Sequence, residues 1–248
     1  MGPRPEKTEL CAVLEEAAAR LRRAGSVFVL TGSGISAESG LPTFRGAGGL
    51  WRTHRVEELA SPQGFARDPR LVWTWYNERR AAHARAEPNA AHRALAELER
   101  RCADFTLATQ NVDSLHLRAG SRNVLELHGQ LREARCTGCA FRRPLDDDFD
   151  VAAIEHDCGG RLRPDIVWFG EPLPAEVWAA AAQAAQRAEV VLVIGTSGIV
   201  HPAASLATAY ARDAYVIEVN PEETAITEAV DVSLRGAATA LVPELVGA

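Results

Sequence analysis

Residues 26–46 read SVFVLTGSGISAESGLPTFRG and decide the fold expected for this chain. Val27 to Leu30 form an apolar run typical of a buried parallel strand. The next residues, GSGISA at 32–37, match the G-x-G-x-x-G/A pattern, whose small residues let backbone amides approach a pyrophosphate. A dehydrogenase would continue with a second strand and a ribose-binding acid about 20 residues further on. A loop rich in proline and glycine follows instead, so the pattern indicates dinucleotide binding and disfavours hydride transfer.

Three later apolar runs also end in polar residues. FTLAT at 105–109 leads into QNVD, VVLVI at 190–194 leads into GTS, and YVIEV at 215–219 leads into NPEE. Ligands of a doubly wound parallel sheet bind outside the carboxyl ends of its strands, so we expect all four strand ends to line one crevice. The alternative is that these polar residues serve only as turn formers, which loops require.

Composition and charge narrow the class of protein. The chain has 248 residues and is 47% apolar, which suffices for one large domain or slightly more. No apolar run approaches the roughly 20 residues of a membrane span, and the first residues lack a signal-peptide apolar segment, so we expect a cytoplasmic protein without a membrane partner. The net charge is -6 and the basic residues are scattered, which argues against a nucleic-acid partner. Five cysteines, an odd number, indicate a reducing compartment without disulfides.

Proline and cysteine placement suggests how the chain is organised. Residues 8–24 read as an amphipathic helix that leads into the first strand. Residues 56–101 read as helical but are interrupted by prolines, which indicates a small helical module inserted after the glycine loop. Residues 130–165 carry cysteines, charges and a glycine pair, and are interpreted as a second insertion. Strands at 214–219 and 230–234 are expected to close the sheet.

His128 is the candidate for acid–base chemistry. It follows the run VLEL and precedes Gly129, so an imidazole stands at a strand end beside a flexible position. Histidine is the side chain best able to take and return a proton near neutral pH. Most histidines have no catalytic role, and the others in this chain, among them His92 and His116, are interpreted as structural.

Four motifs occur together in one order along the chain. They are TGSGISAESGLPTFRG at 31–46, TQNVDSLHLRAG at 109–120, LELHG at 125–129 and GTS at 195–197. Together they resemble the sirtuins, the NAD-dependent protein lysine deacylases, over nearly the whole chain. The resemblance implies an α/β fold with a doubly wound, Rossmann-like parallel sheet, and a smaller domain formed by a helical insertion and a cysteine-bearing ribbon insertion. It assigns 1–37, 93–129 and 167–248 to the NAD-binding domain, and 38–92 with 130–166 to the small domain.

The resemblance also implies a reaction, with NAD as co-substrate in the cleft between the domains. The acyl oxygen of an acylated lysine would attack C1′ of the nicotinamide ribose, nicotinamide would leave, and an ADP-ribosyl imidate would form. His128 would then act as general base on the ribose hydroxyls, while Asn111 and Asp113 hold the ribose and the nicotinamide pocket. The residues expected to contact NAD are Gly32, Ser33, Gly34, Ile35, Ser36, Ala37, Phe44, Arg45, Trp51, Gln110, Asn111, Val112, Asp113, Gly195, Thr196, Ser197, Asn220, Pro221, Glu222 and Ala238.

Two further segments bear on the acyl substrate. Val167, Trp168 and Phe169 belong to VWFGE, a family-like segment beside which the acylated peptide would add as a strand, with little preference for peptide sequence. Tyr76 and Arg79 are three residues apart on one helical face, where a phenol and a guanidinium could grip a carboxylate. This pair resembles the class III sirtuins, which remove succinyl, malonyl and glutaryl groups; acetyl removal is expected as well. The alternative is an aromatic residue and an arginine on an ordinary helix.

The cysteines suggest a metal site with one ligand changed. Cys136, Cys139 and Cys158 resemble three ligands of the sirtuin zinc ribbon, a structural four-cysteine site. The fourth cysteine would be at position 155, where the chain has Glu155, with His156 beside it. Zinc accepts imidazole or carboxylate, so either residue could complete the site. The alternative is a ribbon that has lost its metal.

Two other functions fit an NAD site of this kind. A mono-ADP-ribosyltransferase or NAD glycohydrolase would use the same activated C1′ with a protein side chain or water as acceptor. A non-catalytic NAD sensor would bind the nucleotide without turnover. The presence of His128 and Asn111 disfavours the sensor, and the pair Tyr76 and Arg79 favours the deacylase, because the other functions need no acyl clamp.

Overall fold

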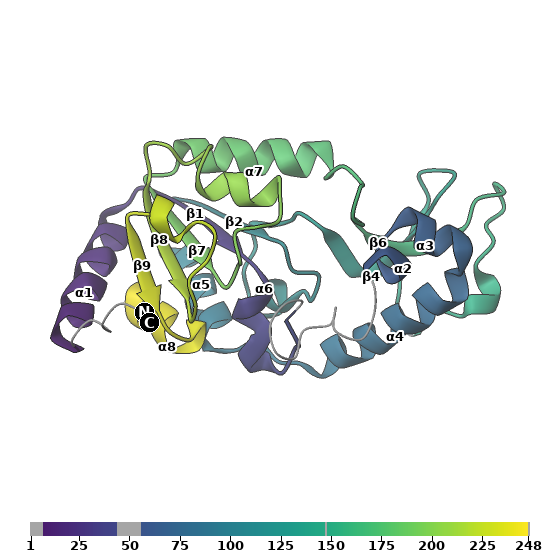
Figure 1. Ribbon diagram of the computed structural model, residues 1–248, viewed down its shortest axis with the longest axis horizontal. Helices are drawn as coiled ribbons and strands as arrows, with labels where there is room; N and C mark the ends of the chain where they lie inside the picture. The colour runs from purple at the N-terminus through teal and green to yellow at the C-terminus, as the bar shows by residue number, and fades with distance from the viewer. Residues whose placement is uncertain (1–6, 44–55, 147, 248) are drawn as a thin grey trace.

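The computed structural model describes residues 7–43, 56–146 and 148–247, and Figure 1 shows their arrangement. Six parallel strands form one sheet in the order β3-β2-β1-β7-β8-β9. This order is that of doubly wound dinucleotide-binding folds, so the expected fold class is confirmed. The strands are β1 (Ser26–Thr31), β2 (Asp104–Thr109), β3 (Val124–Glu126), β7 (Val190–Ile194), β8 (Tyr215–Asn220) and β9 (Val232–Arg235).

Alternate residues of the parallel strands face two separate cores. On β1, Val27 and Val29 pack in one apolar cluster, whereas Phe28 and Leu30 pack in another on the opposite face. A strand covered on both faces needs apolar residues throughout, which explains why VFVL shows no polar alternation. One face is covered by α1 (Lys7–Arg23), α5 (Ala90–Arg101) and α8 (Ala238–Val246), and the other by α7 (Ala175–Arg187) and the short helix η4 (Ala203–Ala207).

A smaller, three-stranded antiparallel sheet lies at the other end of the molecule (Figure 1). Its order is β5-β4-β6, and three helices accompany it. The elements are β4 (Gly129–Cys136), β5 (Arg142–Pro144), β6 (Leu162–Ile166), α2 (Val56–Leu59), α3 (Pro62–Arg67) and α4 (Pro69–Arg85). The ring of Trp73 on α4 stacks on Phe149 with centroids 3.9 Å apart, and its indole N–H donates to the carbonyl of Leu162 at 2.9 Å. The two expected insertions therefore share one core, while the domain boundaries stay a prediction.

The prolines that interrupt the helical region begin two of its helices. Pro62 and Pro69 stand in the first turns of α3 and α4, where the missing N–H costs no intrahelical bond. Ser61 and Asp68 cap these helices, with side chains that accept from the amides of Gly64 and Leu71. In the ranges that the structure describes, no helix is long and apolar enough to cross a bilayer.

Candidate active site

The four polar strand ends line one cavity of about 530 Å³. The sheet contributes residues at and after the ends of β1, β2, β7 and β8. The opposite wall comes from α4, from His128 just before β4, and from the end of β6 with the segment after it. The expected site residues on these walls are Gly32, Ser33, Gly34, Ala37, Tyr76, Arg79, Gln110, Asn111, Val112, His128, Val167, Trp168, Phe169, Gly195, Thr196, Ser197, Asn220, Pro221 and Glu222. The cavity thus lies between the carboxyl edge of the parallel sheet and the smaller sheet.

Two glycine loops meet at the floor of this cavity. The amide of Gly34 donates to the carbonyl of Gly195 at 2.8 Å, and a Cβ added to Gly34 would come within 2.7 Å of the Gly195 Cα. Gly195 has φ +62°, which favours glycine. A side chain at either position would push the loops apart, so their close approach accounts for both glycines.

Other residues expected to contact NAD lie elsewhere. Ile35 is fully buried in the core beneath the sheet, and Ala238 lies at the start of α8 in the same core. Ser36 and Asp113 are buried behind the cavity wall. Phe44, Arg45 and Trp51 are outside the described residues.

Ser36 and Asp113 hold Asn111 in place through a chain of hydrogen bonds. The Asn111 amide nitrogen donates to the Gly32 carbonyl at 3.1 Å and to Ser36 Oγ at 3.2 Å. A carbonyl can only accept, so the orientation of the Asn111 amide is fixed. Ser36 Oγ in turn donates to Asp113 Oδ2 at 2.7 Å, and the Leu115 amide donates to Asp113 Oδ1 at 2.9 Å. Burial raises the pKa of Asp113, while these hydrogen bonds oppose that change.

Two buried histidines support the same region. His116 Nε2 lies 3.0 Å from Thr31 Oγ1, and His92 Nε2 lies 3.4 Å from Ser36 Oγ, with the two rings 4.8 Å apart. Burial lowers the pKa of His92 to about 4 and that of His116 well below its usual value. Both imidazoles are therefore neutral near pH 7, in keeping with a structural interpretation.

His128 faces the cavity in a defined tautomer. Its Nδ1 lies 3.0 Å from the carbonyl oxygen of Gln110, which can only accept, so Nδ1 carries the proton. In the neutral ring, Nε2 then carries the lone pair and can take a proton. Burial lowers the pKa of His128 below the ordinary 6.5, and the bond to Gln110 partly offsets this.

We expect an NMR titration of His128 in the nucleotide-free protein to have its midpoint below pH 6.5. Because the pKa lies below its ordinary value, the base form should predominate at pH 7 and be lost as the pH falls through the midpoint. The His128→Ala variant assigns the resonance. A midpoint above 6.5 would show that the bond to Gln110, and not burial, dominates.

Tyr76 and Arg79 come together on α4 at the cavity wall. They are 3% and 9% exposed, and the Arg79 guanidinium lies 4.7 Å from the centroid of the Trp75 ring. The indole N–H of Trp168 donates to the Tyr76 hydroxyl oxygen at 2.9 Å. Burial raises the pKa of Tyr76 to about 12, so the phenol keeps its proton and can donate it.

An ion pair between Arg163 and Glu171 holds Trp168 in position. The Arg163 guanidinium lies 3.3 Å from the centroid of the indole and donates to both carboxylate oxygens of Glu171. Glu171 Oε2 also accepts from the backbone amide of Trp168 at 2.8 Å. Sequence reasoning missed this arrangement: Glu171 ends the segment VWFGE, but nothing in that segment indicates that its carboxylate pairs with Arg163.

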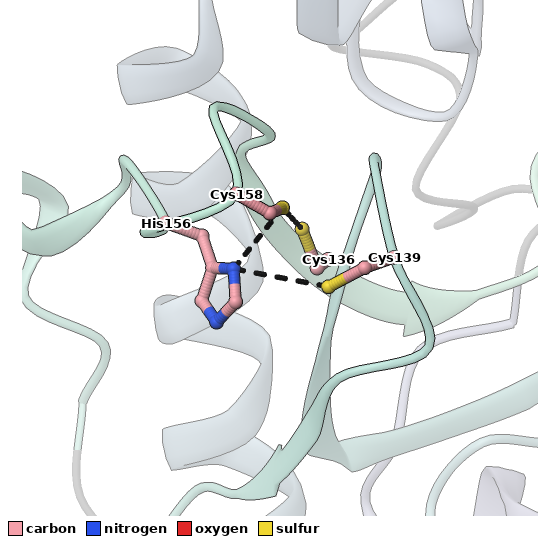
Figure 2. Close-up of side chains that lie close together, drawn as sticks. All are labelled: Cys136, Cys139, His156 and Cys158. Atoms are coloured by element: carbon pink, nitrogen blue, oxygen red, sulfur yellow. Dashed lines mark hydrogen bonds between the residues drawn. The ribbon is translucent and has the colours of Figure 1, made fainter.

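Cys136, Cys139, Cys158 and His156 form a four-ligand cluster, shown in Figure 2. Their ligand atoms all lie within 4.8 Å of one another, with Cys136 and Cys158 sulfurs 3.4 Å apart and His156 Nδ1 3.2 Å from Cys158 Sγ. A tetrahedral zinc with Zn–S of about 2.3 Å and Zn–N of about 2.0 Å needs separations of roughly 3.5 to 3.8 Å between ligand atoms. The donor set and its spacing fit structural zinc.

The fourth ligand is His156 rather than Glu155. Glu155 instead pairs with Arg161 at 3.0 Å, across a short backbone bridge between the same two residues. The His156 ring stacks on Phe141, with centroids 4.5 Å apart, which orients Nδ1 toward the sulfurs. Zinc bound here would fasten the loop of residues 156–160 to the end of β4.

We expect protein purified without chelator to contain about one zinc per chain, since four ligands form a closed structural site. His156→Ala should lose zinc to a chelator faster and melt at a lower temperature, by roughly 2 to 4 °C for each kcal/mol lost. His156→Cys, which supplies a fourth thiolate, should retain the metal and serves as the matched control. Wild-type protein free of zinc would contradict this assignment.

The fold combines a dinucleotide-binding sheet with a small sheet that carries cysteines, and the cavity lies between them. This combination indicates a class of NAD-using proteins, and comparison with known proteins identifies the family. The model of the Sir2 family matches residues 32–202. An NAD-dependent protein deacylase of Thermococcus kodakarensis is 50% identical over 242 residues, 94% of each chain. A Sir2 homologue solved as an NAD complex is 48% identical with a TM-score of 0.88, covering 94% of this chain and 92% of that one.

A further solved structure bears on the second substrate. A Sir2 protein bound to a myristoylated histone peptide is 36% identical, with a TM-score of 0.77 and 95% of both chains covered. From these matches, the chain belongs to the Sir2 family and is an NAD-dependent protein deacylase.

Proposed function

We propose that this deacylase acts preferentially on lysines carrying acidic acyl groups, such as succinyl, malonyl and glutaryl, and yields nicotinamide and O-acyl-ADP-ribose. The observation that carries the proposal is the buried pair Tyr76 and Arg79 at the wall of the cavity that also contains His128. A charge-assisted hydrogen bond in a buried site is stronger than a neutral one, so an acyl carboxylate would gain more here than an acetyl methyl group.

The geometry of Tyr76 suits it to donate to a carboxylate. Its oxygen already accepts from the Trp168 indole, which leaves the phenol's own proton for another acceptor. Arg79 adds a cation one helical turn away, on the same face of α4. A carboxylate placed between them would receive a neutral and a charged donor at once.

The other residues that line the cavity would bind NAD and transfer a proton. NAD, when bound, supplies an activated ribose carbon to which the acyl oxygen can add. His128, with its lone pair on Nε2, would take a proton from a ribose hydroxyl, and Asn111 would hold the ribose through its fixed amide. The glycine loop of residues 32–37 and Thr196 would contact the phosphates. Asn220 and Glu222 would contact the adenosine ribose.

The peptide would bind where apolar side chains are exposed beside the cavity. Phe169 and Ile199 are each 50% exposed, on the segments that follow β6 and β7. These are the two segments between which an added strand would lie. Backbone pairing of this kind gives affinity that depends little on peptide sequence, so acylated-lysine proteins of varied sequence would be substrates.

The test compares matched peptides that differ only in the acyl group on one lysine. With NAD in excess, kcat/KM for the succinyl peptide should exceed that for the acetyl peptide. A myristoyl version of the same peptide tests whether the pocket instead prefers a long apolar chain. Equal or higher kcat/KM for either neutral acyl group would overturn the proposed preference, while deacylation itself would stand.

A further inference from the structure

Glu218 has a buried carboxylate that takes no part in the proposed deacylation reaction. It is 1% exposed on β8, next to the strand end that lines the cavity. Its carboxylate accepts hydrogen bonds from three hydroxyls: that of Thr224, that of Thr227 at 2.8 Å and that of Ser233 at 2.7 Å. Among the residues described, no basic side chain forms an ion pair with it.

The pattern of donors calls for a carboxylate at this position. Each hydroxyl has one proton, and all three donate that proton to Glu218. Burying a charged group is unfavourable unless hydrogen bonds satisfy it, and these three supply that compensation. A glutamine keeps the shape of this side chain but removes its charge, so the bonds to the three hydroxyls would become neutral and weaker.

Two of the three hydroxyls, those of Thr224 and Thr227, belong to the segment of residues 220–227, whose first part lines the cavity. Residues 220–224 line the cavity, and Thr224 and Thr227 fasten this segment to the sheet through Glu218. The Thr224 amide also donates to Thr227 Oγ1 at 2.9 Å, which closes the turn. The Ala225 amide donates to the Ser197 carbonyl at 3.2 Å, so the segment continues into the neighbouring wall after β7.

The topology of the sheet indicates which end of NAD this wall would meet. His128 follows β3 at one edge of the sheet, whereas β8 lies on the far side of β1 and β7. A nucleotide with its reacting ribose beside His128 would therefore extend along the carboxyl ends of the strands toward β8. The wall of residues 220–224 would hold the adenosine end.

We propose that Glu218 is a positioning residue, which fixes residues 220–227 and so forms the adenosine-side wall of the site. The proposal rests on NAD binding and not on the acyl preference. Loss of this anchor would weaken the dinucleotide and ADP-ribose alike, because both carry the adenosine end. It would leave the proton transfer at His128 unaffected.

Glu218→Gln tests this proposal by calorimetry with ADP-ribose. We expect the Kd to rise on the order of tenfold, because the three bonds that hold the segment lose their charge-assisted character. KM for NAD should rise in parallel with kcat little changed, and inhibition by nicotinamide should keep its constant. Ser233→Ala is the matched control: it removes a donor on β9, outside the wall, and should change the Kd by less.

A second variant keeps the proposal testable if Glu218→Gln does not fold. Thr227→Val keeps a β-branched side chain and removes the hydroxyl that donates to Glu218. It should weaken ADP-ribose binding on the order of tenfold, because the bonds that this hydroxyl makes to Glu218 and to the Thr224 amide are lost together. Wild-type affinity for ADP-ribose in a folded Glu218→Gln or Thr227→Val protein, or a fall in kcat with KM unchanged, would overturn the proposal.

Discussion

His128→Ala is expected to lower kcat/KM for deacylation by about 10²- to 10⁴-fold, the usual contribution of a general base. The imidazole is at the cavity wall, its Nδ1 proton is committed to the Gln110 carbonyl, and its lowered pKa keeps Nε2 free of a proton at pH 7. Alanine removes that proton acceptor from the wall. NAD binding, measured by calorimetry, should change far less than turnover.

His201→Ala is the matched control for this variant. His201 lines the same cavity but is exposed, on the segment after β7. Its removal should leave kcat within about twofold of wild type, as for a surface substitution. The assignment of His128 as the base fails if His128→Ala keeps more than a tenth of wild-type activity, or if both variants lose activity equally.

Arg79→Met should lower desuccinylation by about 10- to 150-fold, since a hydrogen bond to a charged group contributes roughly 1.5 to 3 kcal/mol. Methionine fills much of the space and removes the cation, so deacetylation should fall much less. The measurement is kcat/KM for succinyl and acetyl forms of one peptide. A double variant with Tyr76→Phe should lose less than the product of the single losses, because both side chains would bind one carboxylate.

Arg80→Met is the control on the same helix. Arg80 donates to the carbonyls of Leu131 at 3.1 Å and Leu145 at 2.6 Å and does not line the cavity. Its loss should lower thermal stability while the ratio of the two activities stays that of wild type. Equal loss of both activities in Arg79→Met would make Arg79 a structural residue and remove the basis for acidic-acyl preference.

Much of the fold could be predicted because strong local patterns determined it. The run VFVL has no polar alternation, and such a strand needs cover on both faces, as β1 has. The last two strands, expected at 214–219 and 230–234, are β8 and β9 within one or two residues. The shared carboxyl edge of parallel strands then brought the polar strand ends into one cavity.

Burial and long-range pairing were harder to predict. The spacing of the cysteines left open whether Glu155 or His156 is the fourth zinc ligand. In the structure Glu155 pairs with Arg161, and His156 joins the three cysteines. Ile35 lies inside the short helix Ser33–Ser39 and Ala238 begins α8, and both side chains face the core, which motif matching does not show. Glu218 did leave a signal, a single acid in the apolar run YVIEV, but its partners are up to 15 residues away.

The most direct test of the account is the product ratio from wild-type protein, NAD and a succinylated peptide, measured by mass spectrometry. If the cavity transfers the acyl group to the ribose, nicotinamide and O-succinyl-ADP-ribose should form in a one-to-one ratio. Nicotinamide with free ADP-ribose or an ADP-ribosylated protein, and no acylated sugar, would indicate a glycohydrolase or an ADP-ribosyltransferase. Binding of NAD without release of nicotinamide would indicate a sensor, and either result would contradict the account.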